Sequence, residues 1–557
     1  MPQKPLYSKA PLLILSHAFS GNGMIRSDES HLLTLYENLK NKTDSPALLE
    51  GLFMLSCILR NRPLEEPVAQ RILSEIAETE DGSFRGSFSN QICIARAALA
   101  LYDYNTDRAI LRRIYNWVQY VEKEYSVLSQ QDGFLFRPAD LMELLIRFYY
   151  ISGVKAVLRL CEQIRETAFD WTTVLHTLNR STPFTSNQED IREPNAIPSE
   201  LAFADKEKIV NNGEMLADAV RYTLFAGIYS GNKQDITAGY TAWKHLLKNH
   251  HAICGGTTGN PFLSGSGGDQ PISAAVVSAW TEAFTSQMLL KKCEWAVEEL
   301  NRIVYNALPD FINRYPIPEI RYTNGFGISE TESIATEKQD LIYARLTRAA
   351  ASAYKHMVSL TTRGIRINYL LPASMLLKLD NQRAVIHFHS DSISIKCDIP
   401  ISSEIDFFVL PSKDTDILLQ RSTKEQKVLF HSDKTEHAVY LHTDASLSDG
   451  DCILVKQNDD TMILQTHHQG VYILKNNRLM TYAVSEKTYS IAFSQILSED
   501  DCCAEVIPIN DWKIKNSQPA DIPVLPVSQS SPIKVRLTPY DQTEQRVTMF
   551  PRINKNV

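Results

Sequence analysis

The hydrophobic pattern divides the chain into two parts of different periodicity. From about residue 28 to residue 180, apolar residues recur at helical spacing in segments separated by short turns with Gly, Asn and Asp. Ser45 and Pro46 mark one helix start, with serine as the N-cap and proline at the first helical position. This pattern predicts a succession of helical hairpins.

The period changes at Gly364. Beyond it, apolar and polar residues alternate with period two, and turn signals follow roughly every eight to twelve residues. This predicts one β-sandwich or two. We therefore expect a helical domain over residues 1–362, a β-sandwich over 363–520, and a segment over 521–557 that completes the β region.

Two polar segments interrupt the helical part. Residues 181–210 carry prolines and show little periodicity, which predicts a long connection of the kind that often forms a lid or a binding loop. A second loop rich in aromatic residues and glycine follows Pro309.

Residues 211–306 carry the strongest candidate chemistry. Leu216, Val220 and Leu224 form an apolar stripe, and Asp218 lies opposite it, close to Arg221. On a later helix Glu282 shares a face with small residues. A buried carboxylate costs several kcal/mol unless it is paired or hydrogen-bonded, so each of these acids should meet a partner or a ligand.

A glycine loop lies between these two helices. It contains Gly255, Gly256, Gly259, Gly265, Gly267 and Gly268, at a spacing that matches neither a P-loop nor a dinucleotide-binding motif. Two interpretations stay open: a long surface loop, or a loop that lines a site at the mouth of a helical barrel.

Four short motifs in this stretch resemble glycoside hydrolase family 127, the β-L-arabinofuranosidase-like family. They are Ala219-Val220-Arg221, Gly255-Gly256, Trp280-Thr281-Glu282 and Tyr305-Asn306-Ala307-Leu308. Further patches, among them Glu143 in the helix at 138–153, extend the resemblance over roughly residues 90–552. The resemblance implies an (α/α)6 helical toroid followed by a C-terminal β-sandwich, with an oligosaccharide or glycoside as substrate.

The chain departs from this family at the reactive positions. The family uses a zinc-bound cysteine as nucleophile, but the matching positions here are Phe284, Lys338 and Gln339. The position of the family's acid/base glutamate falls near Ser264, and the nearest carboxylate is Asp269. Two family histidines are replaced by Asp140 and Asp218. We therefore expect no metal and no cofactor at this site.

The remaining acids give two hypotheses from different classes. In the first, the chain is a glycoside hydrolase that acts on a plant- or microbe-derived oligosaccharide through carboxylates in the lumen. Its catalytic candidates are Glu282, Asp218 and Asp269, and its substrate-binding candidates are Asp140, Glu143, Arg221, Tyr222, Gly255, Gly256 and Tyr322.

In the second hypothesis, the chain is a non-catalytic carbohydrate-binding or scaffolding relative. The acids would then pair with arginines such as Arg221 or Arg345 and hold helices together. Carboxylates facing an open pocket favour the first hypothesis, and carboxylates capped by arginines favour the second.

Composition and net charge limit the classes of binding partner that the chain is expected to have. The chain has 557 residues and a formal net charge of −8, so nothing in it favours nucleic acid or an anionic membrane. The apolar run at residues 10–19 is shorter than a membrane-spanning helix, and we expect it to pack onto the fold. Nine scattered cysteines favour a reducing cytoplasm. Whether the chain forms a homodimer stays open.

Overall fold

The structure is a computed structural model of the whole chain. Within the helical part it describes residues 23–27, 29–59, 66–77, 79–131, 133–184, 203–268, 270–290, 293–314, 316–323 and 336–360. Beyond residue 363 it describes residues 364–379, 382–389, 392–397, 404–409, 415–421, 424–427, 431–434, 439–443, 448–457, 463–467, 470–475, 478–483, 490–498, 503–509, 533–543, 546–548 and 550–551. The apolar run at 10–19 and Asp269 lie outside the described residues.

The first part of the chain is helical, as the period predicts. Its helices are α1 (Ser30–Leu39), α2 (Pro46–Leu59), α3 (Pro67–Glu75), α4 (Phe88–Asn105), α5 (Arg108–Leu128), α6 (Ala139–Ser152), α7 (Lys155–Thr167), α8 (Trp171–Thr177), α9 (Phe203–Val210), α10 (Gly213–Ser230), α11 (Lys233–Asn249), α12 (Ala274–Gln287), α13 (Glu294–Arg302), α14 (Leu308–Ile312) and α15 (Thr336–Lys355). A 3-10 turn, η3 (Phe134–Phe136), precedes α6, and one π-helical turn, η5 (Ile303–Ala307), joins α13 to α14. Helix α2 begins at Pro46, as predicted.

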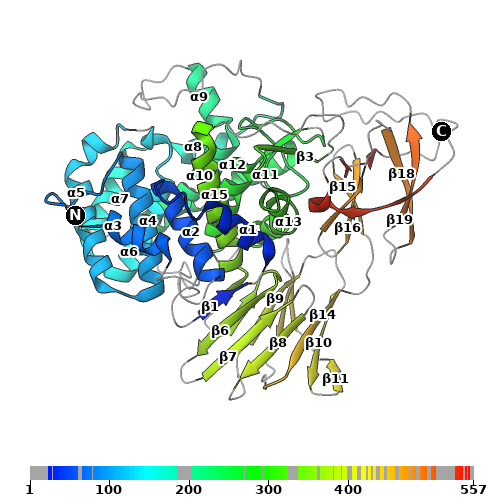
Figure 1. The fold of residues 1–557 in the computed structure, drawn as a ribbon. Coiled ribbons are helices and arrows are strands. Elements are labelled where there is room, and N and C mark those ends of the chain that lie inside the picture. Colours follow the sequence, from blue (N-terminus) through cyan, green and yellow to red (C-terminus); the bar gives the residue numbers. More distant parts are fainter. Residues whose placement is uncertain are drawn as a thin grey trace.

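Six of these helices form a closed ring. Helix α2 contacts α4, α4 contacts α6, α6 contacts α10, α10 contacts α12, and α12 contacts α15. Helix α15 in turn contacts α2, which closes the ring. Helices α3, α5, α7, α11 and α13 each pack on one or more of these six helices (Figure 1). A side chain that points to the middle of the ring therefore meets side chains from several helices at once.

Local sequence signals fix the two ring helices that carry the strongest candidates. The side chain of Asn212 caps α10 by accepting hydrogen bonds from the amides of Glu214 and Met215. Gly231 ends α10 with a φ of 72°, a conformation that favours glycine. Ser273 caps α12 in the same way by accepting from the amide of Val276. The start of α12 and both ends of α10 are therefore set by the sequence itself.

Three details of the helical part differ from the prediction. Part of the connection expected at 181–210 is helical, since α9 occupies Phe203–Val210. The loop after Pro309 contributes a short strand, β3 (Ile320–Tyr322), which pairs with β2 (Pro271–Ser273) immediately before α12. Helix α15 ends at Lys355, and strand β4 (Val358–Leu360) begins before Gly364. Short strands are hard to predict because two or three residues show no period.

The second part of the chain consists of strands grouped into sheets. One group holds a seven-stranded sheet in the order β1-β6-β7-β8-β14-β10-β11 and a five-stranded sheet in the order β12-β13-β9-β5-β4. Its strands are β1 (Gly23–Arg26), β4, β5 (Gly364–Ile367), β6 (Ala373–Leu379), β7 (Gln382–Phe388), β8 (Ser392–Cys397), β9 (Glu404–Val409), β10 (Thr415–Arg421), β11 (Lys424–Lys427), β12 (His431–Lys434), β13 (Val439–Thr443) and β14 (Cys452–Gln457).

A second group of sheets follows from residue 463. It comprises a sheet ordered β15-β16-β17-β21, with β22 on β17 and β23 on β16, and a sheet ordered β18-β19-β20. Its strands are β15 (Ile463–His467), β16 (Gly470–Lys475), β17 (Arg478–Ala483), β18 (Ser490–Ser498), β19 (Cys503–Ile509), β20 (Ile533–Arg536), β21 (Thr538–Pro539), β22 (Arg546–Val547) and β23 (Phe550–Pro551). Sheet pairing sets no domain limits, so the boundaries at 362 and 520 stay predictions.

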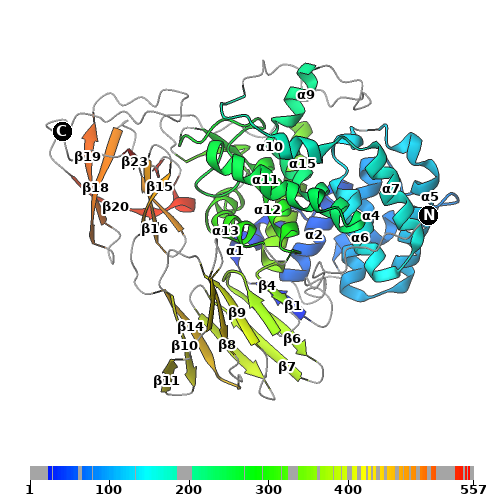
Figure 2. The ribbon, with the colours of Figure 1, turned by 180° about the vertical axis from the view of Figure 1, so that it is seen from behind.

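Figure 2 shows the two groups of sheets beside the helical part. Polar contacts join the helical part to both groups. The Tyr305 hydroxyl donates to the Leu370 carbonyl at 2.8 Å, and Arg302 donates to the Tyr472 hydroxyl at 3.1 Å. Strand β1 precedes the first helix in sequence, yet it pairs with β6 in the seven-stranded sheet. No helix in the described part of the chain is long and apolar enough to cross a membrane.

Candidate functional site

The centre of the helical ring holds a network of paired charges to which all six ring helices contribute. We call it the ring network and define it by ten residues: Glu50 on α2, Arg96 on α4, Asp140 and Glu143 on α6, Glu214, Asp218 and Arg221 on α10, Glu282 on α12, and Arg345 and Arg348 on α15. Four guanidinium groups thus meet six carboxylates in the interior of the fold.

Arg221 lies at the middle of the ring network. Its side chain is only 1% exposed, and it donates through Nη1 to Oε2 of Glu282 at 2.6 Å. Its Nη2 donates to Oδ1 of Asp140, and its Nε lies 3.5 Å from Oε2 of Glu143. One guanidinium therefore joins carboxylates from two other helices, α6 and α12.

Glu282 is held between two arginines. Besides Arg221, Arg348 donates from Nε to Oε1 of Glu282 at 2.6 Å. Burial of Glu282 opposes its ionisation, but Arg348 and Arg221 outweigh this effect and lower the pKa of its carboxyl to about 2. Glu282 is therefore a carboxylate at neutral pH and has no proton to give.

Asp140 is the most accessible carboxylate of the ring network. Arg96 donates to its Oδ1 at 2.7 Å, and 26% of the side chain is exposed. Burial opposes ionisation here too, but the guanidinium groups of Arg96 and Arg221 hold the pKa of the Asp140 carboxyl well below its usual value. One helical turn further on, Glu143 is 17% exposed and lies 3.5 Å from Arg96. Helix α6 thus supplies the accessible part of the ring centre.

The remaining carboxylates of the ring network are also paired. Arg345 donates to Oδ2 of Asp218 at 2.8 Å and lies 3.2 Å from Glu214. Arg96 donates from Nε to Glu50 at 2.7 Å. Because buried ion pairs need such partners to offset desolvation, these contacts account for the acids found in long apolar helices.

The structure brings some of the predicted residues together and leaves others apart. Asp140, Glu143, Asp218, Arg221 and Glu282 all belong to the ring network. Burial raises the pKa of the Tyr222 hydroxyl, and its charged neighbours are Arg165, Asp235 and Asp170, none of them in the ring network. Tyr322 pairs with Pro271 in the sheet of β2 and β3. A substrate contact by either tyrosine stays a prediction.

The first part of the glycine loop, including Gly255, Gly256 and Gly259, is buried, whereas Gly265 and Gly267 are half-buried. Gly255 has a φ of 101°, and a Cβ there would lie 2.6 Å from the Ile303 side chain in η5. Gly256 has a φ of 78° and lies against Trp280. Both glycines therefore allow close packing of the loop on α12 and η5. Their substrate contact stays a prediction.

The positions that would carry the zinc-bound cysteine do not fit that metal. Phe284 is fully buried and packs on Trp280 and Trp243, with ring centroids 5.2 and 4.9 Å away. The Gln339 amide donates to the Tyr343 hydroxyl at 2.9 Å. Glu282 is already occupied by two arginines. Among the described residues, no group of three or more His, Cys, Asp and Glu side chains could hold a metal ion.

The sequence analysis did not predict four members of the ring network: Glu50, Arg96, Glu214 and Arg348. Glu50 is the only charged residue of α2, and Arg96 shares the apolar helix α4 with one other charge, Asp103. A rare charge within an apolar helix is the signal that singled out Glu282. Arg348 follows Arg345 by three residues and so shares its helix face. Applied to every ring helix, the rare-charge signal would have found Glu50 and Arg96, and the shared helix face would have found Arg348.

Comparisons with known proteins agree with this architecture. No protein-family model matches the chain, and no curated protein matches it. Among solved structures, one described as a glycoside hydrolase aligns with a TM-score of 0.67 at 10% identity, covering 95% of this chain and 96% of its own. A GH127 β-L-arabinofuranosidase from Geobacillus stearothermophilus T6 aligns with a TM-score of 0.61 at 12% identity, covering 94% of both chains.

A further GH127 β-arabinofuranosidase aligns with a TM-score of 0.60 at 12% identity, covering 94% of this chain and 92% of its own. At such low identities these likenesses show the fold and nothing finer. The resemblance inferred from short motifs is thereby confirmed for the fold.

Proposed function

We propose that the protein is a glycoside hydrolase-like protein that binds an uncharged glycoside at the ring centre and does not hydrolyse it through a carboxylic acid/base pair. The observation that carries this proposal is the pairing of every acid in the ring network with arginine. A glycosidase of the two-carboxylate type needs one protonated carboxyl to protonate the leaving group. With the pKa of Glu282 near 2 and that of Asp140 also lowered, neither can serve as that acid at neutral pH.

The charge of the ring centre favours an uncharged ligand. Arg137 lies 3.4 Å from Glu214, and Lys355 lies close enough to Glu143 and Glu50 for their charges to act on it. Burial and Arg147 lower the pKa of Lys355 to about 8, so it is still charged at pH 7. Together with the four arginines of the ring network, these two cations balance the charge of the six carboxylates. Sugar hydroxyls can then donate to the accessible oxygens of Asp140 and Glu143.

The fold supports a glycoside as the ligand class. Solved glycoside hydrolases share the architecture over nearly the whole chain, and a helical ring offers a ligand site between its helices. We extend the fold to an (α/α)6 toroid in which each ring helix has an outer partner, followed by β-sandwiches. The plant or microbial origin of the glycoside follows from the family resemblance alone.

A binding experiment tests this proposal. Titration with short arabinan fragments, followed by calorimetry, should show binding that Asp140→Asn weakens by about tenfold, since one charged acceptor is worth about 1.5–3 kcal/mol. Circular dichroism checks that the variant is folded. The matched control is Glu166→Gln on the exposed side of α7, which should bind like the wild type. Equal affinity of Asp140→Asn and wild type would contradict the proposal that the ligand binds at the ring centre.

Hydrolysis through Asp140 is a second candidate function. This carboxylate is accessible and ionised, as the nucleophile or base of a glycosidase must be. Without an acid, such an enzyme would cleave only glycosides whose leaving group needs no proton. Turnover of dinitrophenyl glycosides that Asp140→Asn abolishes, with alkyl glycosides left intact, would favour this candidate.

Turnover of the same glycosides also tests the role of Glu282. Turnover of alkyl glycosides that Glu282→Gln abolishes, while the melting temperature stays unchanged, would support the lumenal acid/base pair and contradict our proposal. The cytoplasmic location stays a proposal. The described cysteines, which form no disulfide, are compatible with a reducing compartment.

A further inference from the structure

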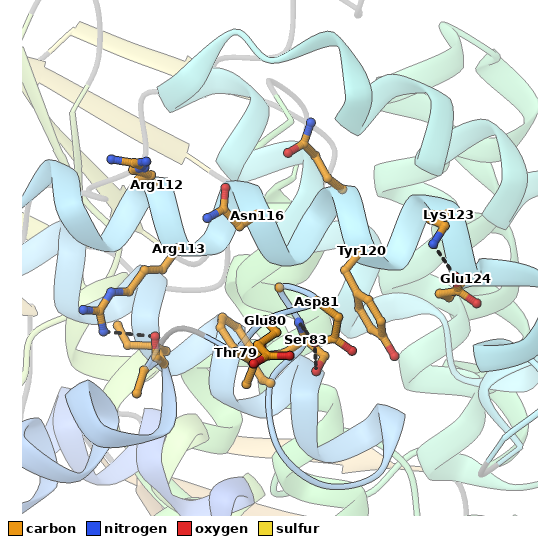
Figure 3. Close-up of a pocket in the computed structure, with 15 residues that line it drawn as sticks. Thr79, Glu80, Asp81, Ser83, Arg112, Arg113, Asn116, Tyr120, Lys123 and Glu124 are labelled. Atoms are coloured by element: carbon orange, nitrogen blue, oxygen red, sulfur yellow. Dashed lines mark hydrogen bonds and ion pairs between the residues drawn. The ribbon is translucent and has the colours of Figure 1, made fainter.

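A polar groove lies on the outside of the helical part, away from the ring network. It runs between the connection from α3 to α4 and one face of α5, and its volume is about 880 Å³. That volume lies within the range of small-molecule binding pockets. The groove (Figure 3) is a part of the molecule for which the fold and the ring centre suggest no role.

One wall of the groove is a polar stripe on helix α5. Arg112, Asn116, Gln119, Tyr120 and Lys123 line it, and their spacing places them along one side of the helix. At about 1.5 Å per residue the stripe is about 16 Å long, which exceeds a single sugar ring and suits a short chain of them. Tyr120 extends from α5 towards the segment with Asp81 and Ser83.

The opposite wall is a turn held by its own hydrogen bonds. Thr79 donates to the Ser83 carbonyl at 2.6 Å, and Ser83 donates to Asp81 at 2.7 Å. Gly82 has a φ of 83°, and a Cβ there would lie 3.1 Å from the Asn116 carbonyl, so this turn packs closely on α5. Arg113 fixes the start of the turn by donating to the Ile76 carbonyl at 3.0 Å. A groove with fixed walls binds with less loss of conformational entropy.

Several polar groups in the groove have no partner within the described part of the chain. Arg112 makes no ion pair there, the Asn116 amide makes no side-chain hydrogen bond, and the Tyr120 hydroxyl is likewise without one. Three acids, Glu80, Asp81 and Glu124, face three bases, Arg112, Arg113 and Lys123. The lining is therefore rich in hydrogen-bonding groups and carries no net charge.

We propose that this groove binds an uncharged oligosaccharide, as a second carbohydrate site separate from the ring centre. The balanced charge disfavours an ionic ligand, and the free guanidinium, amide and hydroxyl groups match the hydroxyl groups of a sugar chain. Tyr120 offers an aromatic ring with a polar tip against which a sugar can pack. A peptide would need apolar pockets, but Ile76 and Phe84, the large apolar residues of the lining, are 1% and 4% exposed.

Hydrogen exchange with and without ligand tests the proposal. The probes are short uncharged fragments of arabinan, xylan and β-glucan, with oligogalacturonate as the charged comparison. At least one uncharged fragment should slow exchange in residues 76–84 and 112–124, and oligogalacturonate should not. Slowed exchange confined to the ring helices, or no effect in these two segments with any uncharged fragment, would overturn the groove as a site.

Substitution of Tyr120 supplies the quantitative test. Tyr120→Ala should raise the dissociation constant at the groove by about tenfold, whereas Tyr120→Phe, which keeps the ring, should raise it by less than about threefold. Tyr150→Ala, at a tyrosine that is 43% exposed outside the groove, is the control and should have no effect. Unchanged affinity of Tyr120→Ala would overturn the proposal. Both measurements are repeated in Asp140→Asn, so that failure at the ring centre and failure at the groove give different results.

Discussion

The ring network and the outer groove contain the same kinds of charged side chain. In the ring network most of these side chains are buried and all are paired, whereas in the groove most are exposed and some are unpaired in the described part of the chain. In the ring network every arginine lies within 2.8 Å of a carboxylate oxygen, and the four arginine side chains are between 1% and 8% exposed. In the groove Arg112 is exposed and has no ion pair among the described residues. Burial makes pairing necessary because an unpaired interior charge is costly, whereas water can solvate an exposed one.

This difference in burial and pairing predicts that the ring network contributes mainly to stability and the groove mainly to ligand binding. A paired, buried group is already occupied, so its first role is to hold helices together. An unpaired group at a solvent-filled groove is available to a ligand. Substitutions in the ring network should therefore lower the free energy of unfolding, and substitutions in the groove should lower affinity alone. Asp140 and Glu143, which are paired and partly exposed, lie between these two cases.

The largest effect should come from Arg221→Met. Arg221 interacts with carboxylates on two other helices, and its loss leaves Glu282 and Asp140 with one neutralising partner fewer. We expect the free energy of unfolding at pH 7 to fall by about 3–5 kcal/mol in urea denaturation. Arg112→Met in the groove is the matched control and should change it by less than about 0.5 kcal/mol. Similar small changes in the free energy of unfolding for both variants would contradict the difference between the ring network and the groove.

Glu282→Gln should have the next largest effect, a loss of a few kcal/mol, because Arg221 and Arg348 lose their common carboxylate. A double-mutant cycle with Arg348→Met sharpens this prediction. The double variant should be more stable than the sum of the two single losses implies, since each change removes the same interaction. Additive losses would show that the two side chains do not interact.

The acid dependence of stability should follow from the same residue. A carboxyl with a lowered folded-state pKa contributes stability that is present above its unfolded pKa and is lost as the pH falls through the folded value. For Glu282 the window lies between about 4.5 and about 2, and the contribution at neutral pH is about 3 kcal/mol. Unfolding free energies measured from pH 6 to pH 2 should fall less steeply in Glu282→Gln. Parallel curves for the two proteins would contradict this.

The smallest effect on stability should come from Asn116→Ala in the groove. The side chain has no hydrogen-bond partner among the described residues, so its removal should change the melting temperature by less than about 1 °C. Thermal unfolding by calorimetry measures this. A fall of several degrees in the melting temperature would indicate that the Asn116 side chain contributes to the packing of the fold.

Periodicity was sufficient to predict the main elements. The start of α2 follows from Ser45-Pro46. Both ends of α10 follow from Asn212 and Gly231, which are local signals too. The closure of six helices into a ring does not follow from periodicity, because every helix with an apolar face needs a partner and the pattern does not say which. The family resemblance supplied that expectation.

The sequence analysis named six members of the ring network, and its second hypothesis named Arg221 and Arg345 as partners of the acids, but the other four members were missed. A lone acid in an apolar helix, such as Glu282, indicates an interior charge but not the identity of its partner. Arg348 and Arg96 come from helices far apart in sequence, and only the ring brings both guanidinium groups to Glu50. Both also lie within 4.0 Å of Asp140. Tyr222 follows Arg221 in sequence, but its charged neighbours Arg165 and Asp235 lie on other helices.

The protonation state of Glu282 is the most direct test of the account. Difference infrared spectra of wild type and Glu282→Gln, recorded from pH 8 to pH 3, isolate the carboxyl band of this one residue. We predict that the carboxylate band persists throughout the range in which the protein is folded, because the pKa lies near 2. A protonated carboxyl band at pH 6 that depends on Glu282 would contradict the account and make this residue an acid able to protonate a leaving group.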